Sequence, residues 1–389
     1  MSSPPWQGRP VWAEIDLDAL AHNVTVLRER AAPARLCAVV KANAYGHGAV
    51  EVARAAVQAG AERLAVICVD EGIQLRRAGL RAPILVLGFT PEAQARDVVA
   101  HALTPSVHDP ALADALSREA ARANVDQPVH LEVETGLNRH GLVPDTLVPA
   151  AERMRALPRI VIEGLFTHFA AAEEGDKTFT RQQFQRLVDA HTRLPWIPLR
   201  HCAATASVLD NPEMRLELVR TGLGLYGYHP APRCGVDVPL QRVLSLKSRV
   251  VRVSALPPGA TVGYGRTWRA ELPATVALVM AGYADGLMRR LSGRAQVLIR
   301  GERAPIAGRV AMDMCMVDVT HIEGVSAGDE VVLLGEQGSD RIDADDLATW
   351  ADSISWEILA GVRERVPRLY LRGGRVVATS TLNGPESRA

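Results

Sequence analysis

The sequence predicts an α/β protein with two parts: an N-terminal barrel of strand–helix units and a C-terminal β-rich domain. Short apolar runs rich in branched residues alternate about eight times with Ala- and Arg-rich stretches of helical periodicity. Alternation of this kind implies parallel strands with helical crossovers. After about residue 240 the chain changes to short strand-like segments separated by Gly, Pro and Asp turns. We place the barrel at 11–242, the β-rich domain at 243–381, and tails at 1–10 and 382–389.

The units of the predicted barrel follow one another at intervals of roughly 20 to 35 residues. Before the first unit, residues 12–16 alternate polar and apolar, and a helical segment follows that Pro33 closes. About eight units within about 220 residues fit a TIM barrel, whose functional groups lie at the carboxyl ends of the strands. A doubly wound open sheet is the structural alternative, but the strand count favours the barrel and no GxGxxG follows the first strand. The apolar runs lie near Leu36, Leu64, Ile84, Leu103, Val129, Val161, Ile197 and Leu216.

The second domain is predicted from alternation of apolar and polar residues. One helix interrupts it, with Leu347, Trp350, Ala351 and Ile354 on one face. The strand-like segments are 243–256, 275–280, 295–300, 314–319 and 330–334.

Composition limits the function classes. The 389 residues include 44 Lys plus Arg and 44 Asp plus Glu, so the formal net charge is zero. A neutral balance argues against a broad surface for nucleic acid or for an anionic membrane. No apolar run approaches the roughly 18 residues of a spanning helix. The N-terminus has no basic region followed by an apolar core, so we expect a disordered arm and no secretory signal. The five scattered cysteines predict free thiols in a reducing cytoplasm.

The most informative stretch is 38–48, AVVKANAYGHG, which follows a buried apolar run. A lysine at the carboxyl end of a buried strand can have a lowered pKa and act as a nucleophile, although Lys41 alone is equally compatible with a surface position. The whole stretch resembles the signature around the pyridoxal-phosphate lysine of alanine racemases. A barrel followed by a β-rich domain is also that family's layout, so the resemblance extends from about residue 11 to 371.

The resemblance implies a role for each matching residue at the ends of the first and fifth barrel strands. Lys41 would form a Schiff base with pyridoxal phosphate and then act as a base on one face of the substrate, and Tyr45 would lie near the phosphate. Arg139, in the stretch LEVETGLNRHG, would hydrogen-bond the cofactor's phenolic oxygen and keep the surroundings of the substrate carboxylate positive. Several relatives carry a carbamylated lysine seven residues earlier, where this chain has Glu132. We hypothesise that Glu132 supplies a built-in carboxylate for Arg139.

Later strand ends match the family as well. His168, in LFTHFA, is by itself more typical of a core histidine, but the resemblance implies that it links the catalytic tyrosine to an arginine at the pyridine nitrogen. Thr205 takes the position of a phosphate-binding serine in HCAAT, and Ala204 replaces an asparagine there. The backbone N–H groups of Gly222 and Leu223 would also bind the phosphate, as is common after the last strands of such barrels.

Arg220 matches the arginine at the pyridine nitrogen. An arginine stays charged and cannot accept a proton from the ring, so the ring remains a weaker electron sink. A weaker sink favours the return of a proton to Cα over transamination. An aspartate at this position would instead favour a transaminase or a decarboxylase.

The β-rich domain carries the remaining matches. Tyr264, in TVGYG, resembles the family's second base, which the partner subunit contributes, so the resemblance implies an obligate homodimer with two shared active sites. Lysine and tyrosine have unperturbed pKa values of about 10, so the site must lower at least one of them. Tyr283 would line the substrate entrance, and the backbone N–H of Met312 would bind the substrate carboxylate. Glu364 stands where some relatives have a phenol, which leaves side-chain selectivity open.

The resemblance therefore implies a cytoplasmic, pyridoxal-phosphate-dependent racemase of the alanine racemase family. It would interconvert L- and D-alanine with two bases and supply D-alanine for peptidoglycan. A broad-specificity racemase, a decarboxylase on the same scaffold and a non-enzymatic carrier of pyridoxal phosphate are the alternatives. We predict no metal site and no nucleotide site, because the chain has no HExxH, CxxC or GxxxxGK[ST] motif.

Overall fold

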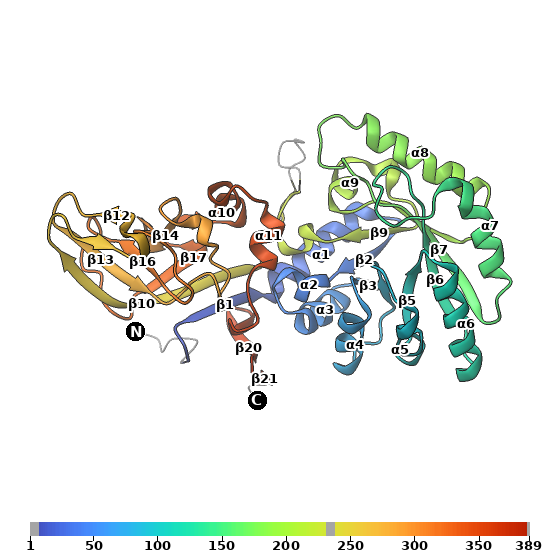
Figure 1. Cartoon of the computed structure of the whole chain (residues 1–389), viewed down its shortest axis with the longest axis horizontal. Helices are drawn as coiled ribbons and strands as arrows, with labels where there is room; N and C mark the ends of the chain where they lie inside the picture. The colour runs from blue at the N-terminus through green and yellow to red at the C-terminus, as the bar shows by residue number, and fades with distance from the viewer. Residues whose placement is uncertain (1–7, 231–237, 387–389) are drawn as a thin grey trace. The chain divides into compact units, whose positions relative to one another are not determined.

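The computed structural model describes residues 8–230 and 238–386 and divides into two compact units (Figure 1). The barrel unit comprises Ala19–Ala44 and Ala49–Gln241. The β-rich unit comprises Met1–Asp18, Tyr45–Gly48 and Arg242–Ala389.

The barrel unit contains a sheet of eight strands in the order β8-β7-β6-β5-β4-β3-β2-β9, with parallel pairing throughout. A parallel bridge between Ala204 and Arg220 joins the end of β8 to β9 and brings the sheet close to a closed ring. Every predicted apolar run lies in a strand or within two residues of one, so the predicted TIM barrel is confirmed. The strands are β2 (Arg35–Val39), β3 (Arg63–Val66), β4 (Ile84–Val86), β5 (Leu103–Val107), β6 (Gln127–Glu132), β7 (Ile160–Phe166), β8 (Leu199–His201) and β9 (Leu218–Thr221).

Helices connect these strands, and Figure 1 shows α4 to α8 around the outside of the sheet. Helix α6 illustrates how the sequence sets their ends: the Asp109 side chain accepts a hydrogen bond from Ala111 N, Pro110 opens the first turn, and Asn124 ends the helix in a left-handed conformation. The helices are α1 (Leu17–Ala31), α2 (Lys41–Tyr45), α3 (Ala49–Gln58), α4 (Val69–Arg77), α5 (Ala95–Ala100), α6 (Pro110–Ala123), α7 (Pro144–Arg155), α8 (Thr178–Thr192) and α9 (Thr205–Asp210), with short 3-10 helices η1 (Glu92–Gln94), η2 (Pro212–Met214) and η3 (Leu223–Tyr226).

The β-rich unit is built on a large sheet whose main path runs β15-β14-β17-β10-β1-β19-β20-β21. Strand β1, from the start of the chain, pairs antiparallel with β10 and parallel with β19. The strands are β1 (Val11–Asp16), β10 (Leu244–Leu256), β11 (Thr261–Val262), β12 (Trp268–Arg269), β13 (Ala274–Val279), β14 (Gln296–Ile299), β15 (Glu302–Pro305), β16 (Cys315–Asp318), β17 (Glu330–Gln337), β18 (Asp340–Ile342), β19 (Arg368–Arg372), β20 (Arg375–Thr381) and β21 (Gly384–Glu386).

The prediction of one helix through Leu347 and Ile354 is wrong. The structure has two helices there, α10 (Ala344–Ala351) and α11 (Ser355–Ala360). Asp352 adopts a left-handed conformation that ends α10, and Ile354 is extended at the start of α11. Asp343 and Asp346 form a capping box at the start of α10.

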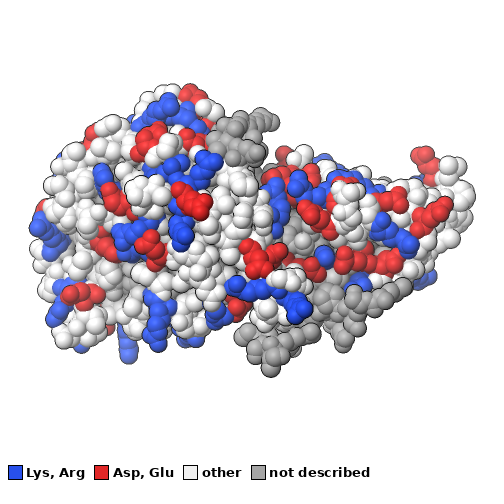
Figure 2. All heavy atoms as spheres, turned by 180° about the vertical axis from the view of Figure 1, so that it is seen from behind, with Lys and Arg blue, Asp and Glu red and all other residues white. Residues whose placement is uncertain are grey.

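Burial and charge agree with the composition. Strands β3, β4 and β5 are buried along their whole length, as parallel strands covered on both faces should be. On the face shown in Figure 2, basic and acidic side chains are interspersed. Among the described residues no helix is both long and apolar enough to cross a membrane. Cys37, Cys68, Cys202 and Cys315 are free thiols, whereas Cys234 and the outer parts of both tails lie outside the described residues.

Candidate active site

Lys41 stands at the carboxyl end of β2, at the start of an unusual turn. The four residues Ala42–Tyr45 all have left-handed backbones, with φ between 51° and 53°. Such a conformation costs non-glycine residues roughly 1–2 kcal/mol each, so its surroundings must stabilise it. The Glu71 carboxylate accepts a hydrogen bond from Ala42 N (2.7 Å), and the Asn43 side chain accepts one from Ala49 N (2.8 Å). The turn therefore fixes the direction in which the lysine leaves the strand.

The environment of Lys41 favours its neutral amine. Burial lowers the pKa of this half-buried lysine, and the positive charges of Arg139 and Arg220 lower it further. The Glu71 carboxylate acts in the opposite sense. A neutral amine is a nucleophile and a base, so the pKa of Lys41 is shifted in the direction that its predicted role needs.

Arg220, in β9, is a buried cation, 3% exposed, and none of its hydrogen bonds goes to an anion. Its guanidinium donates to His201 Nδ1, to Thr167 O (2.9 Å) and to His168 Nδ1 (3.3 Å). No carboxylate of the described residues pairs with it. The site thus holds an uncompensated positive charge beside Lys41 and Arg139.

The partners of Arg220 fix the tautomers of a histidine chain. Because arginine can only donate, His201 Nδ1 must accept, and His201 Nε2–H then donates to His130 Nδ1 (2.8 Å). The remaining proton of His130 lies on Nε2, which faces Glu163 Oε2 at 3.4 Å. Burial lowers the pKa of both His201 and His130. Two neutral imidazoles therefore run through the barrel interior from Arg220 to Glu163.

The same argument sets the tautomer of His168, which follows β7. Its Nδ1 accepts from Arg220, so its proton lies on Nε2. Burial, followed by the charges of Arg220, Arg139 and Lys41, lowers its pKa to about 3. His168 is a neutral hydrogen-bond donor at physiological pH.

Arg139 lies on the loop after β6 and is half exposed. Glu134 shapes this loop, because its carboxylate accepts hydrogen bonds from Gly136 N (2.5 Å) and Arg139 N (3.2 Å). Glu132 Oε1 lies 3.9 Å from the Arg139 guanidinium. Glu132 Oε2 lies closer, 2.8 Å, to His140 Nδ1. Burial raises the pKa of Glu132 against the opposing effects of His140 and Arg139.

The candidate phosphate site lies after β8 and β9. The Thr205 hydroxyl accepts hydrogen bonds from Gly222 N (3.1 Å) and Gly224 N (3.3 Å). The Gly222 N–H is therefore already engaged, whereas the Leu223 N–H has no partner among the described residues. A Cβ on Gly224 would lie 2.6 Å from the Thr205 methyl group, so this close approach requires glycine.

The β-rich unit carries the other predicted residues. Tyr264 is 73% exposed and opens the short helix η4 (Tyr264–Arg266) between two glycines at φ 70° and 71°. Tyr283 N donates to Ala311 O (3.0 Å), which places Tyr283 next to the segment that contains Met312. The Met312 N–H has no partner in the described part of the chain. A Cβ on Gly282 would lie 2.3 Å from Met312 O, so glycine permits this packing.

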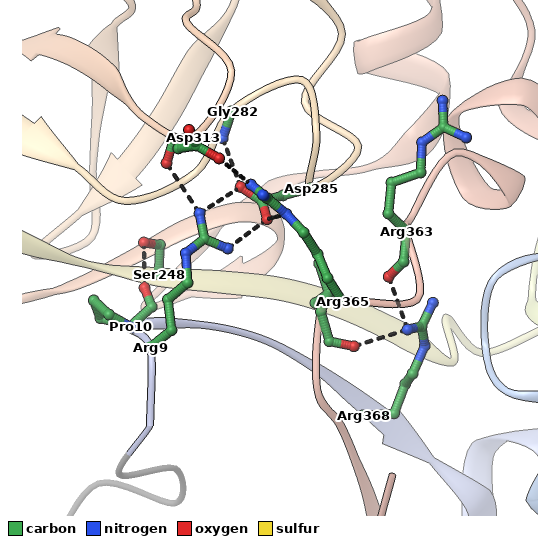
Figure 3. Close-up of polar contacts among 10 residues, drawn as sticks. Arg9, Pro10, Ser248, Gly282, Asp285, Asp313, Arg363, Arg365 and Arg368 are labelled. Atoms are coloured by element: carbon green, nitrogen blue, oxygen red, sulfur yellow. Dashed lines mark hydrogen bonds and ion pairs between the residues drawn. The ribbon is translucent and has the colours of Figure 1, made fainter. Parts of the chain in front are cut away.

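An ionic cluster around the buried Asp285 stabilises these loops (Figure 3). The fully buried carboxylate of Asp285 accepts hydrogen bonds from Arg9, from Arg365 (2.8 Å) and from Gly282 N (2.9 Å). Arg365 also binds Asp313 (2.7 Å), next to Met312. Burial alone would raise the pKa of Asp285, but these hydrogen bonds outweigh it and leave the pKa below its usual value.

Sequence reasoning missed several members of these clusters. His201 belonged to a quoted motif, yet its bond to Arg220 was not foreseen, and neither His130 nor Asp285 was singled out. Arg9 lies in the predicted N-terminal tail but pairs with Asp285 across 276 residues.

Two other predicted residues differ in their exposure. Tyr45 is buried, and burial raises the pKa of its phenol to about 12. Glu364 is exposed.

Family models match both parts of the chain. Residues 15–230 match the alanine racemase N-terminal domain, and residues 243–370 match the alanine racemase C-terminal domain. Alanine racemases of Halothermothrix orenii and Symbiobacterium thermophilum are 43% and 44% identical over 367 and 366 residues. Each alignment covers 93% of this chain and 97% of the relative.

Solved structures agree with these matches. The alanine racemase of Clostridium difficile 630 is 32% identical, with a TM-score of 0.92, over 97% of this chain and 99% of that one. The Bacillus anthracis alanine racemase with bound L-Ala-P is 34% identical, with a TM-score of 0.90, over 97% and 98% of the two chains.

Proposed function

This chain belongs to the alanine racemase family, and we propose that it is a pyridoxal-phosphate-dependent enzyme that interconverts L-alanine and D-alanine. The observation that carries the proposal is the presence of two residues in one site. Lys41 has a lowered pKa, and the buried Arg220 donates hydrogen bonds only to neutral acceptors. A lysine alone would suit many reactions of amines and carbonyls. Arg220 narrows this set of reactions, because an arginine cannot protonate or deprotonate the ring nitrogen of the cofactor.

The residues at the barrel strand ends fit pyridoxal phosphate. The buried cation Arg220 makes no ion pair with a carboxylate of the described residues, and Arg139 lies nearby, so the site favours an anionic ligand. Thr205 and the free N–H of Leu223 are suitable donors for its phosphate. When bound, the cofactor withdraws electrons from the substrate's Cα and makes the proton there acidic.

Two residues of this chain would move that proton. The neutral amine of Lys41 takes or returns it on the D side, and the phenolic oxygen of the partner subunit's Tyr264 does so on the L side. The exposure of Tyr264 supports this role, since a phenol that faces solvent in one chain is free to meet a second chain. The protein is then a homodimer with two shared active sites.

Neighbouring residues orient and tune these two bases. His168 Nε2–H would donate to the phenolic oxygen of the partner subunit's Tyr264 and favour its ionised form, while Arg220 holds His168 in that tautomer. Arg139 and the backbone N–H of Met312 bind the substrate carboxylate, and Tyr283 lines the entrance. Tyr45 lies near the cofactor phosphate, and Glu132 orients Arg139. We further propose a cytoplasmic location and a role in supplying D-alanine for peptidoglycan.

A chiral assay tests the function. Purified protein loaded with pyridoxal phosphate is incubated separately with L-alanine, L-serine, L-lysine and L-arginine, and the enantiomers are separated. We expect D-alanine and little of the other D-amino acids; comparable conversion of all four would make the protein a broad-specificity racemase.

Two variants test the residue roles in the same assay. Lys41→Ala should bind no cofactor covalently, as borohydride reduction and mass analysis would show. Tyr264→Phe should keep the covalent cofactor and lose racemisation, and full activity of that variant would refute the two-base proposal.

A further inference from the structure

Two histidines and a glutamate from neighbouring strand ends meet beside Arg139. His108 follows β5, Glu132 ends β6, and His140 lies on the loop after β6. Strands β5 and β6 are parallel neighbours in which Val107 pairs with Leu131, so His108 and Glu132 come next to each other one residue later. One donor atom from each of the three side chains lies within 4.8 Å of the others.

The loop returns to this position because its backbone pairs with the end of β6. Leu142 N donates to Glu132 O (2.8 Å), and Glu134 N donates to Leu142 O (2.9 Å). This pairing brings His140 back over Glu132, and the rings of His108 and His140 lie 4.6 Å apart between centroids, tilted by 50°. The cluster is thus held by backbone hydrogen bonds at both ends of the loop.

The His108 ring in the cluster lacks hydrogen bonds. Both of its ring nitrogens are buried and without a hydrogen-bond partner among the described residues. Glu132 Oε2 and His140 Nδ1, beside it, form an ion pair of 2.8 Å with each other. Buried polar atoms rarely remain unsatisfied, so the unpartnered His108 ring beside this pair calls for a ligand that accepts lone pairs.

We propose that His108, Glu132 and His140 form a binding site for a divalent first-row transition ion such as Zn²⁺. Two imidazoles and one carboxylate form a donor set that suits such ions, whereas Mg²⁺ and Ca²⁺ favour sites made of oxygen ligands. With metal–ligand bonds of about 2.0–2.2 Å in a tetrahedral arrangement, donors on one ion lie about 3.3–3.6 Å apart, a spacing that small side-chain rotations would give these three donor atoms, which lie within 4.8 Å of one another. Three protein ligands leave a coordination position for water.

The ion would act on the loop that carries Arg139. It would tie His140 to the ends of β5 and β6 and so hold the residue next to Arg139, while Glu132 Oε1 remains on the side of the Arg139 guanidinium. The proposed metal site would therefore position the loop near the proposed active site. Metal binding is independent of the proposed function, because it needs neither cofactor nor substrate.

Metal binding to the untagged, cofactor-loaded protein tests the proposal. Zn²⁺ titration by calorimetry, followed by metal analysis after gel filtration, should give one tightly bound ion per chain. His108→Gln should weaken that binding at least tenfold. His101→Gln is the matched control, because His101 lies before the opposite end of the same strand and should leave binding unchanged. Equal binding by the wild type and His108→Gln, or no bound ion, would overturn the proposal.

Cobalt spectroscopy tests the metal site in the wild-type protein, so its result does not depend on whether a variant folds. Co²⁺ bound to the wild-type protein by two imidazoles and a carboxylate should give visible d–d bands typical of four or five ligands. Excess Zn²⁺ should remove them. Only the weak spectrum of hexaaquo Co²⁺, in a protein that racemises alanine normally, would reject the metal site and leave the proposed function intact.

Discussion

At the scale of the residue, Arg220 is the group on which the chemistry depends. Its guanidinium is buried, and its partners are two imidazoles and backbone carbonyls. An arginine in this setting cannot give up its proton, and the neutral histidines behind it supply none. The ring nitrogen of a bound cofactor would therefore stay unprotonated, which favours simple return of a proton to Cα.

Exchanging the charge at this position should change the reaction outcome. In Arg220→Glu, a carboxylic acid can share a proton with the ring nitrogen, so we expect racemisation to fall roughly 100-fold and pyruvate formation per turnover to rise. Chiral analysis of alanine together with a pyruvate assay measures both. Arg220→Lys, which keeps the positive charge, is the control and should not raise pyruvate. An unchanged pyruvate fraction in Arg220→Glu would contradict this role.

His168 should make stability depend on pH. Its pKa in the folded protein is about 3, below the unperturbed value of about 6.5, so as the pH falls below 6.5 only the unfolded chain gains the proton and stability decreases. Each such histidine contributes up to about 1.4 kcal/mol per pH unit. His168→Asn should therefore lose less stability than the wild type between pH 7.5 and 5.5 in urea denaturation. The exposed His321→Asn is the control, and an equal loss in wild type and His168→Asn would argue against a neutral His168.

At the scale of the element, loops at the strand ends hold the functional groups, and each loop is held by its own polar contacts. The left-handed turn after Lys41 depends on Glu71 and Asn43. The loop of Arg139 depends on Glu134. The loops of Tyr283 and Met312 depend on Asp285 (Figure 3). Removing one contact should therefore disturb one loop and leave the others in place.

Asp285 provides the clearest case. Asp285→Asn removes the buried charge that Arg9 and Arg365 share, and we expect a loss of about 3 kcal/mol in the free energy of unfolding of the β-rich unit. Urea denaturation followed by circular dichroism measures it. The control is Asp126→Asn, which breaks the ion pair between Asp126 and Arg159, side chains that are 63% and 43% exposed. This variant should lose less than about 1 kcal/mol in the free energy of unfolding. Equal losses in the two variants would contradict the assignment.

At the scale of the whole molecule, the barrel could be predicted because its strands are short, apolar and regularly spaced. The strands near Leu64 and Ile84 could be predicted from the local sequence pattern alone, because strands buried on both faces are continuous apolar runs. The motif around Lys41 indicated the cofactor. Pairings between distant residues could not be predicted this way, because no local pattern shows that Arg9 meets Asp285 or that β1 joins the β-rich sheet.

The same limit explains the other omissions. His108, Glu132 and His140 come from two strand ends and a returning loop, so their spacing matches no metal motif. The split between α10 and α11 depends on one left-handed residue, Asp352, in an otherwise helical pattern. The site residues that were predicted are those that sit in long contiguous motifs.

Shared active sites can be tested by mixing two inactive variants. Lys41→Ala and Tyr264→Phe chains are combined, dissociated and reassociated. A mixed dimer then has one site with both native bases and one with neither, so about a quarter of wild-type activity should return if half the dimers are mixed. No recovery, with mixed dimers demonstrated by mass spectrometry, would mean that Tyr264 does not serve the partner's Lys41.

The most direct test of two-base racemisation is isotope incorporation. The cofactor-loaded protein is incubated with L-alanine in deuterated water, and the alanine enantiomers are separated and weighed by mass spectrometry. We expect newly formed D-alanine to carry one α-deuteron during the first turnovers, because Lys41, the base that delivers the proton on the D side, exchanges with solvent. D-alanine that retains its original α-proton would contradict the two-base account, and a failure to form D-alanine would contradict the proposed function itself.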